Sequence, residues 1–309
     1  MYKMLFDIYG KIPSLSTKSR IYSFLPSVCR YCLRKAQSFV MKQKKVNTHY
    51  LSNTENVNQE IVVSLTSFPK RLDTLWLTIE SLKRQSIVPL KIVLYLINEE
   101  VTVDQLPKSL VAEIDDLFEI RFRDGKLRAH GKYHFAMKDF PDSCIVTVDD
   151  DMIYPYDTIE ALWQAHLLYP DCVITNNTHQ VVLENNIVKS YAEWNAFYKS
   201  DKIIDKPCLI PMGVGGALYP PYILYKDTLN FELAKSMSYL ADDLWLYAMT
   251  KLAGRRVVKS KFNFLRIMPI DISDNITLTG TNNGECQNDV QFNNVRNYYL
   301  KELNIDIAK

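Results

Sequence analysis

Apolar residues follow two different rhythms along the chain from residue 60 onward. Near-continuous or alternating apolar runs are typical of strands, and they predict strands at 61–67, 90–97, 118–124 and 144–151. Between these runs, apolar residues recur every three or four positions, which predicts helices at 69–85, 104–117 and 131–140. This alternation predicts an α/β fold with a largely parallel sheet and helices on both faces.

The second half of the chain continues the pattern less regularly. We expect a helix at 156–170, strands at 172–177 and 180–191, a glycine-rich turn at 212–221 and a helix at 240–252. Ligands of parallel sheets gather beyond the carboxyl ends of the strands. That rule places the following residues near one edge: Thr66, Ser67, Asp124, Asp149, Asp150 and Asp151.

The first 58 residues differ from the rest in charge. They carry ten Lys or Arg residues against two acids, although the whole chain has a net charge of only +2. Within 16–45, apolar positions have helical spacing and basic residues fall between them. Such a helix can lie on an anionic membrane leaflet, or it can pack on the main domain with a solvated basic face. Because 46–60 is polar and typical of a linker, the sequence predicts an extension at 1–58 and a main domain at 59–309.

Composition places the chain among ordinary globular proteins, with 47% apolar and 23% charged residues. No apolar run reaches the length of about 18 residues that a spanning helix needs, and the N-terminus lacks the features of a signal peptide. The six scattered cysteines are typical of reduced thiols, and the pair Cys29 and Cys32 favours structural use over metal binding. We therefore expect a cytoplasmic protein, peripheral on the inner face of the plasma membrane if 16–45 binds lipid.

Three consecutive aspartates follow the last of the four strands, in the stretch "IVTVDDDMIYP". Three adjacent carboxylates repel one another, so we expect that a bound group uses their charge. Carboxylates are the hard ligands that Mg²⁺ or Mn²⁺ prefers. Asp149 and Asp151 share one side of the chain if the extended geometry continues through them. An ion there would act as a Lewis acid on a departing nucleoside diphosphate. The alternative is that the aspartates only form a turn.

Four ordered segments resemble one enzyme family. "VDDDMIYP" resembles the DxD region of GT-A glycosyltransferases, especially family 2-like bacterial surface-polysaccharide enzymes. "VSLTSFPKR" resembles their first-strand nucleotide-binding segment, "GVGGALYPP" their acceptor-side glycine loop, and "ADDLWL" the motif that carries the base in inverting members. The match covers about 60–295, and it implies a GT-A type, Rossmann-like, mostly parallel mixed sheet flanked by helices.

On the donor side, the resemblance implies that Thr66, Ser67 and Arg71 line the nucleobase and ribose pocket. Asp149 and Asp150 would contact ribose and metal-bound water, and Asp149 and Asp151 would hold the metal. Lys132 would reach the diphosphate, unless it is a solvated lysine at a helix start. Asp124, at the same edge, is a further donor-binding candidate.

On the acceptor side, Gly215 and Gly216 would let the backbone approach a sugar, or would only form a tight turn. Asp243 is the favoured general base and Asp242 the fallback, although helix capping explains one of them equally well. Trp245 is either a sugar platform or core. The polar stretch 279–286 is a candidate lid, and Asp289 a candidate to complete the site.

The resemblance thus implies a metal-dependent glycosyltransferase of the hexosyltransferase type. It would move a sugar from a nucleotide diphosphate donor, expected to be UDP-linked, to a surface glycan such as lipopolysaccharide or capsule, or to a lipid-linked saccharide, with inversion. One alternative is a metal-dependent nucleotidyl or phosphoryl transferase, which the lack of a glycine loop near the acidic strand disfavours. Another is a non-catalytic glycan- or membrane-binding protein. No nucleic-acid partner is expected.

Overall fold

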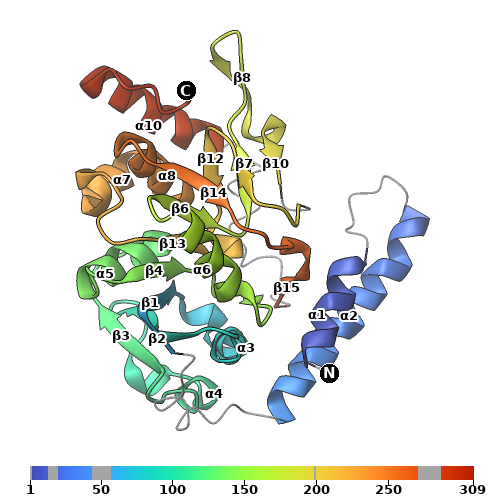
Figure 1. Ribbon diagram of the computed structural model, residues 1–309. Helices are drawn as coiled ribbons and strands as arrows, with labels where there is room; N and C mark the ends of the chain where they lie inside the picture. The colour runs from blue at the N-terminus through green and yellow to red at the C-terminus, as the bar shows by residue number, and fades with distance from the viewer. Residues whose placement is uncertain (1, 13–19, 44–56, 198–199, 271–286) are drawn as a thin grey trace.

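The computed structural model describes residues 2–12, 20–43, 57–197, 200–270 and 287–309. Its centre is an eight-stranded mixed sheet in the order β11-β14-β6-β13-β4-β1-β2-β3 (Figure 1). The bounds of these strands, in that order, are Ile204–Asp205, Arg256–Lys259, Cys172–Thr175, Ala217–Tyr219, Cys144–Thr147, Val57–Thr66, Val88–Ile97 and Phe118–Arg123. The pairs β1–β2, β2–β3, β1–β4 and β6–β14 are parallel, which confirms the predicted mostly parallel α/β sheet.

Strand β13 runs against its two neighbours, and this inversion matters for the site. It pairs antiparallel with β4 and with β6, so its first residue lies level with the last residues of both. The turn that precedes β13 is therefore delivered to the same edge of the sheet as the segments that follow β4 and β6. A purely parallel sheet would have placed that turn at the opposite edge.

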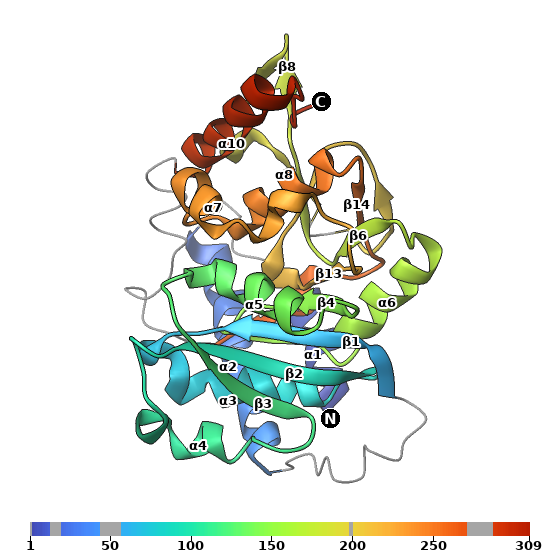
Figure 2. The ribbon, with the colours of Figure 1, turned by 90° about the vertical axis from the view of Figure 1, so that its left-hand side faces the viewer.

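Helices cover both faces of the sheet (Figure 2). Alternate residues of β1 point to opposite faces: Val63 packs in one core with helices α3 and α6, and Val62 in another with α5. Both faces are buried, which explains the unbroken apolar run that predicted this strand. The bounds of the helices of the main domain are α3 Leu72–Lys83, α4 Lys108–Val111, α5 Gly131–Asp139, α6 Thr158–Leu168, α7 Phe231–Ser238, α8 Asp242–Leu252 and α10 Gln287–Leu303.

Three small sheets complete the described strands. One contains β10 (Asn195–Ala196), β7 (Thr178–Gln180) and β12 (Leu209–Pro211), a second is β8 (Leu183–Glu184) with β9 (Ile187–Val188), and a third is β5 (Met152–Ile153) with β15 (Met268–Pro269). The β5–β15 ribbon begins directly after the three aspartates and continues their turn into the main body.

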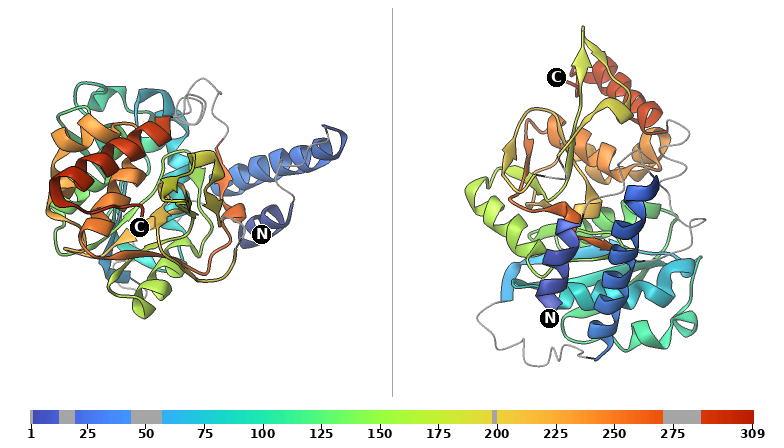
Figure 3. Two further views of the ribbon diagram at one scale, coloured as in Figure 1. Left: turned by 90° about the horizontal axis from the view of Figure 1, so that it is seen from above. Right: turned by 90° about the vertical axis from the view of Figure 1, so that its right-hand side faces the viewer.

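Two helices precede the main domain: α1 (Tyr2–Lys11) and α2 (Arg20–Gln43). Figures 1 and 3 show them side by side along one flank of the molecule. Their inner faces, through Phe6 and Met41 among others, form a core with Leu77 of α3 and with Ile153 and Met268 of the ribbon. The inner face of the hairpin thus packs on the main domain, as one of the two alternatives for 16–45 predicted. The division of the chain at residue 58 stays a prediction.

Three predicted elements differ from the structure. The strand expected at 180–191 is replaced by the short strands β8 and β9 and the start of the 3₁₀ turn Tyr191–Glu193. The helix expected at 104–117 is replaced by the 3₁₀ turn Val103–Gln105 and the four-residue α4, because Pro107 between them cannot continue a helix from the preceding turn. The strand expected at 144–151 ends at Thr147, so the aspartates lie in a turn and not on extended chain. In addition, β1 begins at Val57, within the stretch predicted to be a linker. No described helix is long and apolar enough to span a bilayer.

Candidate functional site

The candidate site lies where the loops after β1, β4 and β6 meet the turn before β13. Ser64 of β1 and Ala217 of β13 are both level with Thr147 of β4, and Ala217 is also level with Thr175 of β6. The acidic turn, the glycine turn and the segment after β1 therefore lie together at the carboxyl edge of the sheet, where the sequence predicted ligand-binding residues.

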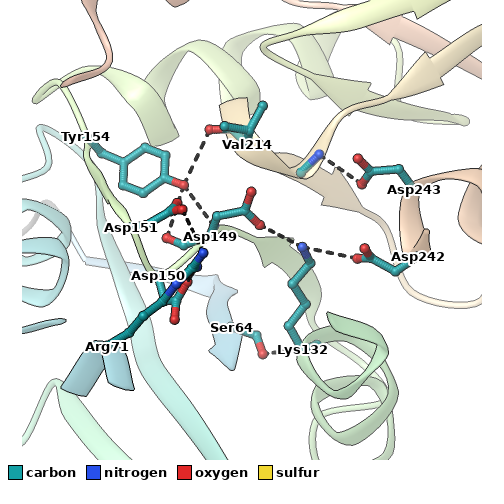
Figure 4. A network of polar contacts seen from close by, with 11 residues as sticks. Ser64, Arg71, Lys132, Asp149, Asp150, Asp151, Tyr154, Val214, Asp242 and Asp243 are labelled. Carbon is teal, nitrogen blue, oxygen red and sulfur yellow. Dashed lines mark hydrogen bonds and ion pairs between the residues drawn. The ribbon is translucent and has the colours of Figure 1, made fainter. Parts of the chain in front are cut away.

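Lys132, the second residue of α5, lies at the centre of the site (Figure 4). Its Nζ donates to Asp149 Oδ1 at 2.8 Å and forms an ion pair with Asp242 Oδ2 at 3.1 Å. The side chain is buried, which disfavours its charged form. The carboxylates of Asp149, Asp242 and Asp243 outweigh that effect and keep the pKa of Lys132 well above its usual value. The solvated-lysine alternative is wrong, because this residue is only 4% exposed.

The acidic pair that opens α8 divides between two partners. Asp242 pairs with Lys132, whereas Asp243 Oδ1 accepts the backbone N–H of Gly213 at 2.9 Å. The residue that caps the helix is Ala241, so neither aspartate is used as the cap. Burial and the neighbouring charge of Asp242 raise the pKa of the Asp243 carboxyl well above its ordinary value.

Gly213 has a role that the sequence did not reveal. A Cβ on this residue would lie 2.9 Å from Lys132 Nζ and 3.2 Å from Asp243 Oδ1, so a larger residue would require one of these side-chain ends to move from its present position. The sequence interpretation considered only the later glycines of the same turn. A glycine at the first position of "GVGGALYPP" could have been noticed, but its neighbours lie about eighty and thirty positions away.

The three aspartates turn in different directions. Asp149 faces Lys132, whereas Asp150 accepts hydrogen bonds from Ser67 Oγ and Arg71 Nη1. Asp151 Oδ2 lies 3.2 Å from Arg71 Nη2. The strand ends before these residues, so the alternation that would put Asp149 and Asp151 on one side does not apply.

The residues predicted for the nucleobase pocket form hydrogen bonds with other groups of the protein. Ser67, Arg71 and Asp150 are buried, and Asp150 accepts hydrogen bonds from the other two. Thr66 Oγ1 donates to the Tyr95 carbonyl of the adjacent strand at 3.0 Å. The structure thus brings these predicted residues to the site, where Ser67 and Arg71 hold the acidic turn in place.

Tyr154 is a buried residue that the sequence interpretation missed. Its hydroxyl accepts the Asp149 N–H at 2.8 Å and can donate to the carbonyl oxygens of Asp149 at 3.3 Å and Val214 at 3.4 Å. It therefore connects the acidic turn to the 3₁₀ turn Gly213–Gly215. Its position five residues after Asp149, in an apolar stretch, is the only sequence signal for it.

The glycines at the end of this turn serve the packing of the sheet edge. A Cβ on Gly215 would lie 2.8 Å from Asn177 Cβ, and Gly216 has a φ of +87°, which favours glycine. These contacts account for both residues as a tight turn. Their predicted approach to a sugar stays a prediction.

The side chains of the acidic turn are of the chemical kind that binds a divalent cation. Asp151 Oδ1 is buried and has no hydrogen-bond partner within the residues that the structure describes. Burial and the charge of Asp149 raise the pKa of Asp151 to about 6. The same described residues contain no cluster of three His, Cys, Asp or Glu side chains placed to bind a metal. Two carboxylates suit Mg²⁺, which is commonly held by one or two of them together with substrate phosphates.

Three other candidates lie outside this cluster. Asp124 is exposed, accepts from Asn98 Nδ2 at 2.7 Å, and follows β3, three strand spacings or about 14 Å from β4. Trp245 is fully buried and donates to the Thr228 carbonyl, so the core alternative is correct and the sugar platform is wrong. Asp289 accepts the Tyr191 N–H at 2.7 Å. The candidate lid at 279–286 lies outside the described residues.

An aromatic group that the sequence did not indicate stands near Asp243. The rings of His179 and Tyr191 lie 5.4 Å apart, and Tyr191 is 4.9 Å from Trp194. Burial raises the pKa of Tyr191, and the charge of Asp243 raises it further. These rings come from segments that periodicity did not resolve.

Fold and site together define an α/β protein with a lysine-bridged acidic centre at the carboxyl edge of its sheet. No protein-family model matches the chain, and no curated protein matches its sequence.

Three solved structures show a weak similarity to this chain. HddC from Yersinia pseudotuberculosis is 13% identical with a TM-score of 0.34, over 53% of this chain and 77% of that one. The 4-diphosphocytidyl-2C-methyl-D-erythritol synthase from Anaerococcus prevotii is 14% identical with a TM-score of 0.40, over 79% and 99%. A UDP-glucose pyrophosphorylase bound to UDP-glucose is 9% identical with a TM-score of 0.38, over 79% and 100%. These values are too low to assign a family or an activity, so the function rests on the site itself.

Proposed function

We propose that the protein is a metal-dependent glycosyltransferase that moves a sugar from a UDP-sugar donor to a surface glycan or a lipid-linked saccharide. The observation that carries this proposal is the double contact of Lys132. One ammonium group joins the acidic turn after β4 to the acidic start of α8. A donor phosphate group and an acceptor hydroxyl must lie this close together if one is to be displaced by the other.

The donor would bind over the acidic turn. Asp149 and Asp151 would hold Mg²⁺ or Mn²⁺, which when bound supplies Lewis-acid stabilisation of the leaving diphosphate. Lys132 holds a buried positive charge at the same place and would attract the phosphate oxygens. Arg71 and Ser67 fix Asp150 and so keep the turn in position.

The acceptor side would use Asp243 as general base. Gly213 N–H holds its Oδ1 and thereby orients Oδ2, which would take the proton from the attacking hydroxyl. Because its pKa is raised, the ionised form of Asp243 is a stronger base than an ordinary carboxylate. Direct attack assisted in this way inverts the anomeric centre. Asp242 is less suited to this role because its charge is paired with Lys132.

Nucleotidyl transfer is the competing reaction for an acidic centre of this kind. A triphosphate commonly lies against a glycine-rich loop whose N–H groups contact the phosphates. No glycine occurs in this chain between Gly10 and Gly125, so the segment after β1 cannot form such a loop. This feature of the sequence is the reason why we propose sugar transfer rather than nucleotidyl transfer.

The experiment combines binding and turnover. Titration calorimetry should show UDP binding that depends on Mn²⁺, and a panel of nucleotide sugars should give one donor that is hydrolysed. Asp243→Asn should keep the binding and lose about 10²- to 10⁴-fold of the turnover. Absence of Mn²⁺-dependent UDP binding, or release of pyrophosphate from a nucleoside triphosphate and a sugar phosphate, would overturn the proposal. Loss of turnover in Asp242→Asn alone would overturn the choice of base.

A further inference from the structure

Helix α2 is apolar on two sides. Its inner side packs in the core that includes Val40 and Met41. Its outer side leaves Val28, Tyr31 and Phe39 exposed to 40%, 50% and 59% of their surface. A helix that only packs on a domain presents a polar outer side, so this exposed apolar side needs another explanation.

Lysines share the exposed side with the apolar residues. The exposed residues on this side recur with the spacing of one helix face: Val28, Tyr31, Cys32, Lys35, Phe39 and Lys42. Helix α1 has exposed Met4 and Ile8 followed by exposed Lys11, and its exposed acid, Asp7, is paired with Arg266 of the main domain. Apolar and aromatic side chains alternating with lysines are typical of helices that lie in a membrane interface.

The charge of α2 is of one sign. Residues 20–43 contain five Lys or Arg residues and no acid. A second copy of this chain would bring the same positive charges against this face and would be repelled. An anionic surface is attracted, and a bilayer with anionic headgroups supplies both the negative charge and an apolar layer.

A groove lies beside this face, between α2 and α3, with a volume of about 400 Å³. Its cationic lining is Arg34, Lys35 and Lys42, and its apolar lining includes Phe39 and Trp76. Asp73 is the only acid among the described residues that line it. Ammonium and guanidinium groups beside apolar side chains match a lipid phosphate whose acyl chains continue into the membrane.

We infer that the α1–α2 hairpin docks the protein on an anionic phospholipid bilayer, with the exposed apolar side chains in the interface and a headgroup phosphate in the groove between α2 and α3. The inference does not depend on the reaction proposed above. It also gives the hairpin two complementary faces: the inner face holds the main domain, and the outer face holds the membrane.

The test is flotation of the full chain with vesicles of equal parts phosphatidylcholine and phosphatidylglycerol, and with vesicles of phosphatidylcholine alone. The parent should float only with the anionic vesicles. Lys35→Ala combined with Lys42→Ala should lower the partition coefficient about 30-fold, since each lysine near an anionic surface contributes about fivefold. Tyr31→Ser combined with Phe39→Ser should lower it as well, because interfacial insertion is lost.

Matched pairs of variants serve as controls. Lys261→Ala with Lys301→Ala removes two exposed lysines of the main domain, and Leu167→Ser with Leu168→Ser removes two exposed leucines of α6. Both pairs should float like the parent.

Several results would overturn the inference. One is a parent that does not float with anionic vesicles. Another is a control pair whose partition coefficient falls as much as that of the hairpin variants. Unchanged flotation of Tyr31→Ser with Phe39→Ser would show that the protein adsorbs to the vesicles by charge alone and that these side chains do not insert. A parent that elutes as a dimer, which Tyr31→Ser with Phe39→Ser converts to a monomer, would mean that a second copy covers this face.

Discussion

Lys132 donates a 2.8 Å hydrogen bond to Asp149, and both side chains reach this contact from segments that end or begin at the same sheet edge. The carbonyl of Lys132 also accepts the hydroxyl of Ser64 in β1, so the start of α5 is fixed to the sheet. Because the same ammonium reaches Asp242, the two acidic motifs cannot move independently. The site is preorganised around one cation of the protein's own chain.

Replacing Lys132 by methionine should destabilise the fold. Asp242 would be left buried without its counter-ion, and the loss of one partner of a buried pair costs about 3 kcal/mol. Urea unfolding should show this loss, whereas Lys138→Met, at an exposed position of the same helix, should leave the free energy of unfolding nearly unchanged. Equal effects of the two substitutions would show that the pairing has no energetic weight.

Gly213→Ala should impair turnover more than stability. The added Cβ must displace Lys132 Nζ or the Asp243 carboxylate, which would disturb the base and its hydrogen bond. We expect a loss of about tenfold or more in donor turnover, since misplacement of about 1 Å can cost up to a hundredfold. Gly254→Ala is the comparison: its φ is +70° but no atom lies within 4 Å of the added carbon, so it should lower stability and leave turnover intact.

The acidic turn should give the fold a characteristic pH dependence. The pKa of Asp151 is about 6 in the folded chain and about 3.9 in the unfolded chain, so the folded state favours the protonated form. Its contribution to stability is complete below about pH 4 and is lost as the pH rises through 6, by about 2 to 3 kcal/mol. The difference in free energy of unfolding between the parent and Asp151→Asn should show this decline, because buried histidines with lowered pKa values, such as His134, change the stability of both chains in the opposite direction.

Asp151→Asn should flatten that decline, because the amide does not titrate. Asp150 and Asp243 also have raised pKa values, so part of the slope should remain. Asp104→Asn, at an exposed position of the 3₁₀ turn Val103–Gln105, should reproduce the parent profile. An Asp151→Asn profile that runs parallel to the parent profile between pH 4 and 6 would contradict the assignment.

Arg71 and Asp150 should show strong coupling in a double-mutant cycle. Arg71→Met leaves the Asp150 carboxylate buried beside Ser67 and should cost about 3 kcal/mol. Asp150→Asn in the same chain should recover part of that loss, with a coupling energy of about 1 to 3 kcal/mol. Lys70→Met, an exposed neighbour, should show no coupling to Asp150. Additive effects of Arg71→Met and Asp150→Asn would refute the pairing.

Periodicity was sufficient for the parallel part of the sheet and for the edge where the acidic turn lies. Strands such as Val88–Ile97 are buried on both faces, and their nearly continuous run of apolar residues indicates this burial. The helix expected at 104–117 failed because Pro107 stopped it, a local signal that outweighed the spacing of apolar residues. The short segments after Thr175 carry too few residues for any period to appear.

The contacts inside the site could not be predicted in the same way. Lys132 pairs with Asp242, 110 positions later, only because β13 is inverted and α8 starts opposite α5. The burial of Trp245 depends on α7, α8 and α10 closing over one another, which no local pattern encodes. Residue type identified which side chains have the chemistry, and tertiary packing decided which of them meet.

The β5–β15 ribbon bears on how the chain can be shortened. Ile153 and Met268 face the N-terminal helices, and the N–H of Ile270 donates to the carbonyl of Asp151 at 2.8 Å. A chain beginning at residue 57 would leave Leu77, Ile153 and Met268 bare to water, at the back of the ribbon that supports the acidic turn. The first two helices therefore support the ribbon that carries the acidic turn, and removing them would make the positions of the aspartates less fixed.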